Sequence, residues 1–159
     1  MLNSDFVIKN DTLVTYMGDD TEVKIPNNVR LIGKGAFKGC RTITSVNIPE
    51  GVVEIGNETF YGCSKLKLVE LPASIEKIGG GAFFQCSKLS DIVLPERLTE
   101  ICGGAFYNCV GLRDLVIPAS VTKIGMNTFR DCYNLTIHAP AGSYAETYAK
   151  ENNIPFVAE

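Results

Sequence analysis

The sequence lacks tryptophan and contains one histidine, His138, among its 159 residues. A Ser/His or Cys/His catalytic site needs a second group held beside the histidine. The nearest cysteine, Cys132, belongs to a regular cysteine column and is expected to be buried and inert. We therefore expect His138 to be a partly exposed residue near the C-terminal end, and we predict that the chain is not an enzyme.

Clusters of positive charge are missing as well. The net charge is −3 and no short window is rich in Lys or Arg, which argues against nucleic acid and anionic membrane as partners. No apolar run approaches the roughly 18 residues of a transmembrane helix. The N-terminal MLNSDFVIKND shows no signal peptide. The chain as given reads as cytoplasmic, unless a signal was removed or lies upstream in a longer gene.

Metal and nucleotide signatures are also absent. A chain with no CxxC pair and one histidine is a poor zinc protein. Asp19 and Asp20 do not have the spacing of a calcium loop. The glycines 79–81 and 103–104 lack the Lys-Ser/Thr of a phosphate-binding loop. We expect neither metal nor cofactor.

The sequence does have a repeat with a period of 23 residues. Each unit carries one phenylalanine and one cysteine, which form the columns Phe37, Phe60, Phe83, Phe106, Phe129 and Cys40, Cys63, Cys86, Cys109, Cys132. A fixed period of this length is typical of a solenoid, whose coils bury their apolar residues against one another. Equivalent side chains on stacked coils point in parallel, so we predict unpaired thiols rather than disulfides. Both columns are interpreted as buried structural ladders.

Each unit predicts two short strands. In Val46-Asn47-Ile48-Pro49, alternation places Val46 and Ile48 inward and Asn47 outward. The proline then ends the strand. A second apolar run follows, centred on Val52 and Ile55 in this unit.

These units resemble the BspA-like leucine-rich repeats over residues 23–136. The shared pattern runs from apolar–x–apolar–Pro through Ile-Gly to Ala-Phe or Thr-Phe and then Cys, as in VNIPEGVVEIGNETFYGCSKLKL. The departures are Cys102 in a glycine column, Ile43 for leucine, and a last unit one residue shorter. The resemblance implies a bacterial or protozoan surface protein that adheres to host matrix proteins or to other cells.

The predicted fold is therefore a right-handed, β-rich solenoid of five coils, which start at residues 23, 46, 69, 92 and 115. Residues 1–22 are expected to form a hairpin cap that turns at Asn10-Asp11. Residues 137–159 are expected to form a helical cap whose N-terminus is Ser143, with Glu146 completing a capping box. Tyr144 and Tyr148 would share one face of this helix, and Ile154, Phe156 and Val157 would close the core. All three parts form one domain.

One outward column predicts an aromatic stripe. The residue after each core phenylalanine is Tyr61, Phe84 or Tyr107 in three consecutive units, and Lys38 and Arg130 flank them. Aromatic and Arg residues are common anchors of interfaces. The alternative is that the rings pack on neighbouring coils and shield the turn.

A second outward column lies on the first strand of each coil. This strand face carries Leu68, Val93 and Val116 and is mixed apolar and acidic toward its C-terminal end. The resemblance implies recognition through the sheet face, although a partner subunit could also cover it. A third column, the charge ladder Glu54, Lys77, Glu100 and Lys123, alternates in sign and is interpreted mainly as a device that fixes register.

The sequence thus predicts a non-catalytic protein-interaction module, with adhesion as the leading hypothesis. A cytoplasmic scaffold is the alternative, since unpaired thiols suit a reducing compartment. A third hypothesis is a redox-sensitive protein that acts through Cys102, which requires an exposed thiol of low pKa. The competing interpretation of Cys102 is a chance substitution at a tolerant position.

Overall fold

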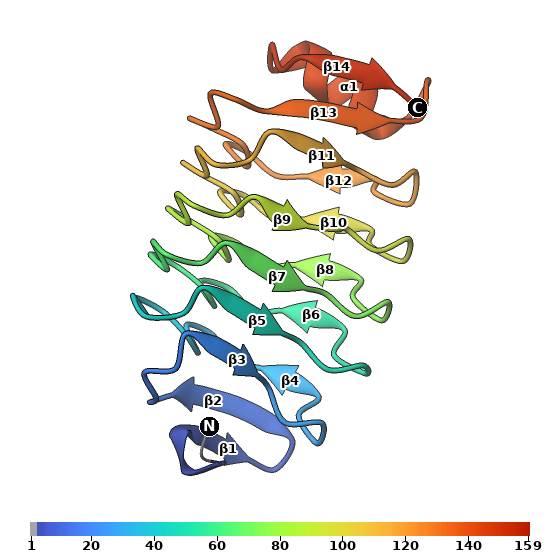
Figure 1. Cartoon of the computed structure of the whole chain (residues 1–159). Helices are drawn as coiled ribbons and strands as arrows, with labels where there is room; N and C mark the ends of the chain where they lie inside the picture. Colours follow the sequence, from blue (N-terminus) through green and yellow to red (C-terminus); the bar gives the residue numbers. More distant parts are fainter. Residues whose placement is uncertain (1–2) are drawn as a thin grey trace.

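The computed structural model describes residues 3–159 and shows coils stacked along one axis (Figure 1). The first strand of each coil forms where the apolar–x–apolar–Pro run predicts it. Val46 and Ile48 point inward and are buried, and Asn47 lies outward between them. These first strands are β3 (Glu22–Lys24), β5 (Ser45–Asn47), β7 (Leu68–Glu70), β9 (Asp91–Ile92) and β11 (Asp114–Val116).

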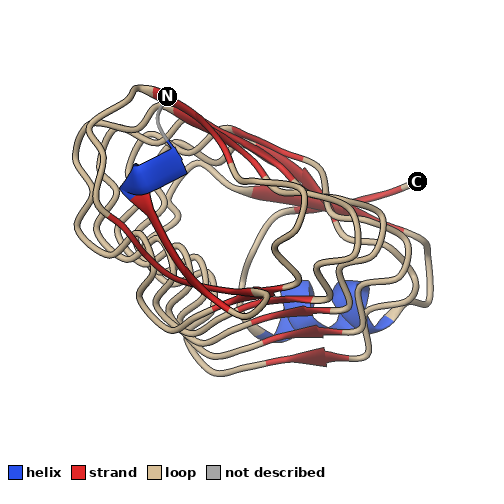
Figure 2. Cartoon of the chain, turned by 90° about the horizontal axis from the view of Figure 1, so that it is seen from below, coloured by secondary structure: helices blue, strands red, loops and turns tan. Residues whose placement is uncertain are grey.

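The second strand of each coil lies on another side of the coil, across the interior from the first (Figure 2). The second strands are β4 (Leu31–Ile32), β6 (Glu54–Ile55), β8 (Lys77–Ile78), β10 (Glu100–Ile101) and β12 (Lys123–Ile124). The last four pair in parallel without a break, in the order β6-β8-β10-β12. The β-solenoid predicted from the repeat is therefore confirmed.

The first strands, in contrast, are divided between two sheets. One sheet has the order β3-β5-β7-β9, and the other has the order β11-β13-β14, with β13 at Thr136–Ala139 and β14 at Phe156–Ala158. Within the described chain, β9 and β11 do not pair, although they belong to consecutive coils.

The N-terminal segment begins with a short 3-10 helix, η1 (Asn3–Asp5), and a hairpin of β1 (Phe6–Lys9) and β2 (Thr12–Tyr16). The hairpin turns at Asn10, whose φ is 58°, as predicted. Strand β2 then pairs in parallel with β4, and the Tyr16 ring lies 5.1 Å from that of Phe37. The hairpin thus acts as a further layer, and the stack has about six turns where the sequence predicted five coils. The predicted boundaries at residues 23 and 136 stay a prediction.

The C-terminal cap contains α1 (Tyr144–Glu151), the helix predicted there. Ser143 Oγ accepts a hydrogen bond from the Glu146 N–H at 3.2 Å, and the Glu146 carboxylate accepts one from the Gly142 N–H at 2.7 Å. The buried face of α1 centres on Ala145 and Ala149, and Tyr144 is 41% exposed. One expectation was wrong: Val157 is exposed, because alternation along β14 turns Phe156 toward the core instead.

A column of phenylalanine rings runs through the interior. The rings of Phe37, Phe60, Phe83, Phe106 and Phe129 stack at centroid distances of 5.1–5.4 Å. Beside them, four of the five column cysteines donate to the carbonyl of a phenylalanine in the preceding coil, as Cys86 Sγ does to Phe60 O at 3.1 Å. The thiol of Cys40, in the first unit, lies near the Thr42 hydroxyl instead. The cysteines are therefore hydrogen-bond donors as well as small apolar residues. Cys40 and Cys132, at the ends of the column, are only half-buried, unlike the predicted ladder.

Candidate protein-interaction surfaces

The aromatic stripe forms as a stack of three parallel rings. The Tyr61 and Phe84 centroids are 4.6 Å apart at 0°, and those of Phe84 and Tyr107 are 4.6 Å apart at 15°. All three residues are half-buried. Because the ring faces cover each other, the stripe presents mainly ring edges to a partner.

A cation lies at each end of the aromatic stripe. Lys38 Nζ is 4.8 Å from the Tyr61 ring centroid, and the Arg130 guanidinium is 5.9 Å from that of Tyr107. Lys38 also pairs with Glu58 at 2.9 Å, and this hydrogen bond lowers the pKa of the Glu58 carboxyl. The exposed ring faces at both ends are thus already occupied by cations from the chain itself.

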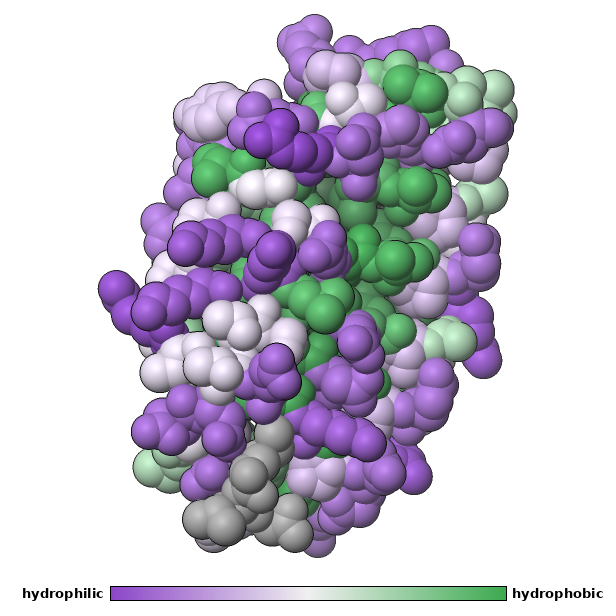
Figure 3. All heavy atoms as spheres, in the orientation of Figure 1, coloured by the Kyte–Doolittle hydropathy of each residue, from purple (hydrophilic) through white to green (hydrophobic). Residues whose placement is uncertain are grey.

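The strand face is less well packed than the aromatic stripe. Val93 is 81% exposed and Val116 is 54% exposed, while Leu68 is half-buried. Hydrophobic surface lies among hydrophilic side chains on this side of the stack (Figure 3). A groove of about 720 Å³, which we call the strand groove, runs between β7 and β9 and reaches Asp114 on β11.

The strand groove lies where the pairing of β7 with β9 ends. Strand β9 pairs with β7 at Asp91 and Ile92 only, so Val93 lies beyond the ladder. Asp91 and Asp114 occupy equivalent positions of consecutive coils. Like charges in neighbouring strands are destabilising. Asp114 turns instead to His138, whose Nε2 lies 2.8 Å from Asp114 Oδ1.

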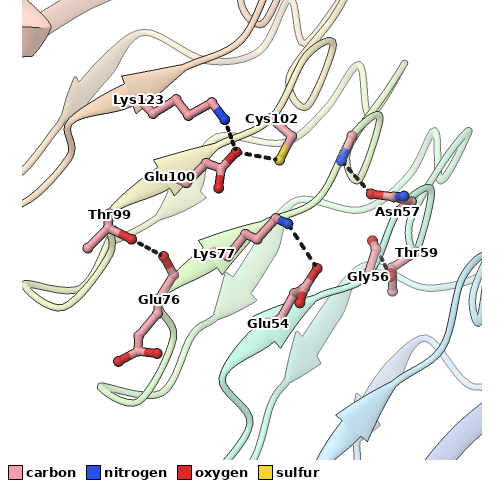
Figure 4. A network of polar contacts seen from close by, with 11 residues as sticks. Glu54, Gly56, Asn57, Thr59, Glu76, Lys77, Thr99, Glu100, Cys102 and Lys123 are labelled. Atoms are coloured by element: carbon pink, nitrogen blue, oxygen red, sulfur yellow. Dashed lines mark hydrogen bonds and ion pairs between the residues drawn. The ribbon is translucent and has the colours of Figure 1, made fainter.

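The second-strand sheet carries the predicted charge ladder. Lys77 Nζ lies 3.8 Å from Glu54 Oε1, and Lys123 Nζ lies 3.3 Å from Glu100 Oε2 (Figure 4). The alternation thus pairs opposite charges on adjacent strands, which is the register-fixing arrangement that the sequence predicts.

Cys102 lies at the edge of this ladder, with Sγ 3.5 Å from Glu100 Oε2 (Figure 4). Burial, and then the Glu100 charge, raise the pKa of this half-buried thiol. The low pKa that a redox role requires is therefore not found. The glycine column is not tolerant either, since a Cβ at Gly79 would lie 2.7 Å from the backbone nitrogen of Asn57.

The thiols of the cysteine column have raised pKa values too. Burial raises the pKa of Cys63 to about 12 and that of Cys132 to about 11. Burial also raises the pKa of Cys86 and of Cys109. These thiols remain protonated and unreactive near neutral pH. All six cysteines are free.

His138 sits between two carboxylates, which sequence reasoning did not predict. Its Nε2 faces Asp114, and its Nδ1 lies 3.3 Å from Glu159 Oε1. The contact arises because β13 pairs with both β11 and β14, and only the fold brings Glu159 there. Across residues 3–159, no group of three or more His, Cys, Asp and Glu side chains is placed to hold a metal ion. No helix in this range is long and apolar enough to cross a membrane.

Comparison with known proteins identifies the repeat. The model of the BspA-type leucine-rich repeat region matches residues 15–136 in six copies. The chain belongs to the BspA-type leucine-rich repeat family. The six copies agree in number with the roughly six turns of the stack.

The structure of this chain is similar to solved structures of bacterial leucine-rich repeat proteins. A leucine-rich repeat protein of T. pallidum is 33% identical, with a TM-score of 0.82 over 87% of this chain and 70% of that one. A leucine-rich cell surface protein of Faecalibacterium prausnitzii is 31% identical, with a TM-score of 0.75 over 90% of this chain and 45% of that one. The chain therefore spans less than half of the second protein. No curated protein matches the chain.

Proposed function

We propose that this repeat protein is a non-catalytic recognition module that binds a protein partner through the strand face. The observation that carries the proposal is the exposure of Val93, a residue that is 81% exposed to solvent beside the strand groove. An aliphatic side chain this exposed contributes nothing to the core, and burial by a partner would remove its apolar area from water.

The aromatic stripe is the second candidate surface, and we rank it below the strand face. Its rings already stack on one another, and Lys38 and Arg130 occupy the two end faces. A partner would therefore gain less apolar contact at the stripe than at the strand groove. This geometry favours the packing interpretation of Tyr61, Phe84 and Tyr107.

Adhesion is the version of this function that the comparisons support best. The F. prausnitzii protein is described as a cell surface protein, and we propose the same setting and a surface or matrix protein as the partner. The six free cysteines favour the cytoplasmic scaffold as the second version, because reducing compartments keep thiols unpaired.

The test is capture of protein partners from a matrix extract and from a lysate of the native cells. The strand-face variant Val93→Ser/Val116→Ser is compared with the stripe variant Tyr61→Ser/Phe84→Ser/Tyr107→Ser. Leu31→Ser is the matched control, since Leu31 is as exposed as Val116, at 54%, but lies on β4, in the sheet that contains the N-terminal hairpin.

We expect the strand-face variant to lose the partner while the stripe variant and Leu31→Ser retain it. If the stripe variant alone loses the partner, and circular dichroism shows that it is still folded, the binding site is the aromatic stripe instead. Capture from the matrix extract supports adhesion, and capture from the lysate alone supports the scaffold.

A further inference from the structure

The strand groove carries unmatched negative charge. Its rim holds four carboxylates, Glu70, Asp91, Glu96 and Asp114, and one cation, Arg97. The Arg97 guanidinium is directed to Glu76, 3.3 Å away. Within residues 3–159, the carboxylates of Asp91 and Glu96 make no hydrogen bond or ion pair. A cationic ligand would therefore meet negative charge that the chain itself does not neutralise.

The floor and wall of the strand groove are apolar. Leu68 and Leu71 are half-buried, and Val93 stands exposed beside them. The apolar surface therefore lies directly next to the carboxylates of Asp91 and Asp114. A ligand that fits both must carry a cation and an aliphatic group close together.

Unpaired backbone groups also face this region. In the flanking coils the residue before the proline donates across the sheet, as Ile48 N does to Glu70 O at 3.0 Å and Ile117 N to His138 O at 2.8 Å. The equivalent N–H groups of Leu71 and Leu94 donate no hydrogen bond within the described chain, and the Val93 carbonyl accepts none there. Such groups are normally satisfied, by protein, water or a ligand.

We propose that the strand groove binds an extended protein segment in which Arg or Lys lies two positions from an aliphatic residue, so that both side chains point to the same side of the segment. The cation lies between Asp91 and Asp114, the aliphatic side chain packs on Leu68 and Val93, and the segment's backbone meets the unpaired groups of Leu71 and Val93. The inference rests on the proposed function, because it names the chemistry of the partner at the strand face.

The direct test uses synthetic peptides and the isotope-labelled full chain. An eight-residue peptide in which Arg and Val take turns at every second position, separated by Ser, is titrated by NMR at low salt; it is called the Arg/Val peptide. The two comparison peptides of equal length are a Glu/Val peptide, with Glu in place of Arg, and an Arg/Ser peptide, with Ser in place of Val. We expect the Arg/Val peptide to bind more tightly than both others. The shifted amides should lie in 68–73 and 90–97, and half-molar salt should weaken binding about tenfold.

Charge variants identify the carboxylates. Asp91→Asn/Asp114→Asn should weaken the Arg/Val peptide about tenfold, since each lost ion pair removes part of the attraction. Glu22→Gln/Glu151→Gln is the matched control, because it removes the same charge from two exposed residues away from the strand groove. Asp91→Lys should reverse the preference toward the Glu/Val peptide.

The outcomes separate this inference from the proposed function. Equal binding of the Glu/Val peptide, shifts outside the strand groove, or no binding by any peptide would overturn the inference. If Val93→Ser/Val116→Ser still abolishes partner capture in that case, recognition through the strand face stands and only the partner chemistry is wrong. If capture is unaffected by that variant, the proposed surface itself is wrong.

Discussion

The two sheets of the solenoid differ in the charges that their outward columns carry. On the second-strand sheet, Glu54, Lys77, Glu100 and Lys123 alternate, and β6, β8, β10 and β12 pair without a break. On the first-strand sheet, Asn47 donates to Glu70 at 2.7 Å in one outward column. In the other outward column Asp91 and Asp114 are neighbours of like charge, and pairing stops between β9 and β11. Complementary outward side chains thus accompany a continuous sheet, and like charges accompany an interrupted one.

The interruption does not reach the core. Between the same two coils, the rings of Phe83 and Phe106 remain stacked at 5.2 Å, and Cys109 Sγ donates to Phe83 O at 3.0 Å. The interior therefore holds the coils together where the surface ladder does not. This separation leaves the residues of the strand face free to vary while the phenylalanine and cysteine columns hold the coils together.

The largest effect expected from a single change is the loss of a spine ring. Phe83 is fully buried between Phe60 and Phe106. Phe83→Ala should lower the free energy of unfolding by about 3–5 kcal/mol, because it leaves a cavity between coils. Urea denaturation measures this. Phe84→Ala, which removes a half-buried ring of the stripe, is the control and should cost clearly less; equal losses would contradict the division between core and surface.

The cysteine column predicts the next largest effect, in alkaline solution. Burial raises the pKa of Cys63 from 9.0 to about 12, so above pH 9 the unfolded chain releases a proton that the folded chain retains. Stability that is present below pH 9 should therefore fall, by up to about 1.4 kcal/mol per pH unit for this thiol. Urea denaturation at pH 8 and pH 10 measures the loss.

Cys63→Ala isolates this contribution from the other titrating groups. The variant should start less stable at pH 8 but lose about 1.4 kcal/mol less between pH 8 and pH 10 than the parent protein. Tyr16, whose pKa burial raises to about 12, titrates in both proteins and cancels from the difference. Parallel pH profiles would mean that the Cys63 thiol is not held protonated by the fold.

The architecture was predictable because five successive repeats place the same types of residue in the same structural environment. Inward residues such as Val46 and Phe83 recur at constant spacing, so their pattern indicates both the strands and the core. The capping box at Ser143 and Glu146 was equally readable, since its hydrogen bonds are local.

The strand groove was not predictable, because it depends on contacts between coils. Val93 and Val116 stood out as outward residues, but the sequence does not show that β9 and β11 fail to pair. The contact of His138 with Glu159 likewise requires β14 to lie beside β13. The stacking that occupies the faces of Tyr61 and Tyr107 also follows from geometry rather than residue type.

Reversing one charge on each sheet tests whether the charges of the outward side chains control the pairing of the strands. Position 91 lies opposite Leu68 on β7 and is equivalent to Asp114 in the next coil. Asp91→Lys therefore replaces a like-charge neighbour of Asp114 by a cation and should raise the free energy of unfolding by about 0.2–1 kcal/mol. Lys77→Glu should lower it, because three carboxylates would then be neighbours on the second-strand sheet. Urea denaturation gives both values, and amide hydrogen exchange should slow at residues 92–94 in the first variant. If the free energy of unfolding rose in both variants or fell in both, the charges of the outward side chains would not control strand pairing.

The smallest effect is expected for Lys77→Ala, which removes one cation from the charge ladder without adding a repulsive group. Lys77 is separated from Glu54 by 3.8 Å and its side chain is 41% exposed, so solvent and salt weaken the attraction. The variant should lose less than about 1 kcal/mol, and the loss should shrink further in half-molar salt. If Lys77→Ala and Phe83→Ala unfolded at the same urea concentration, the assignment of these columns to surface and core would be wrong.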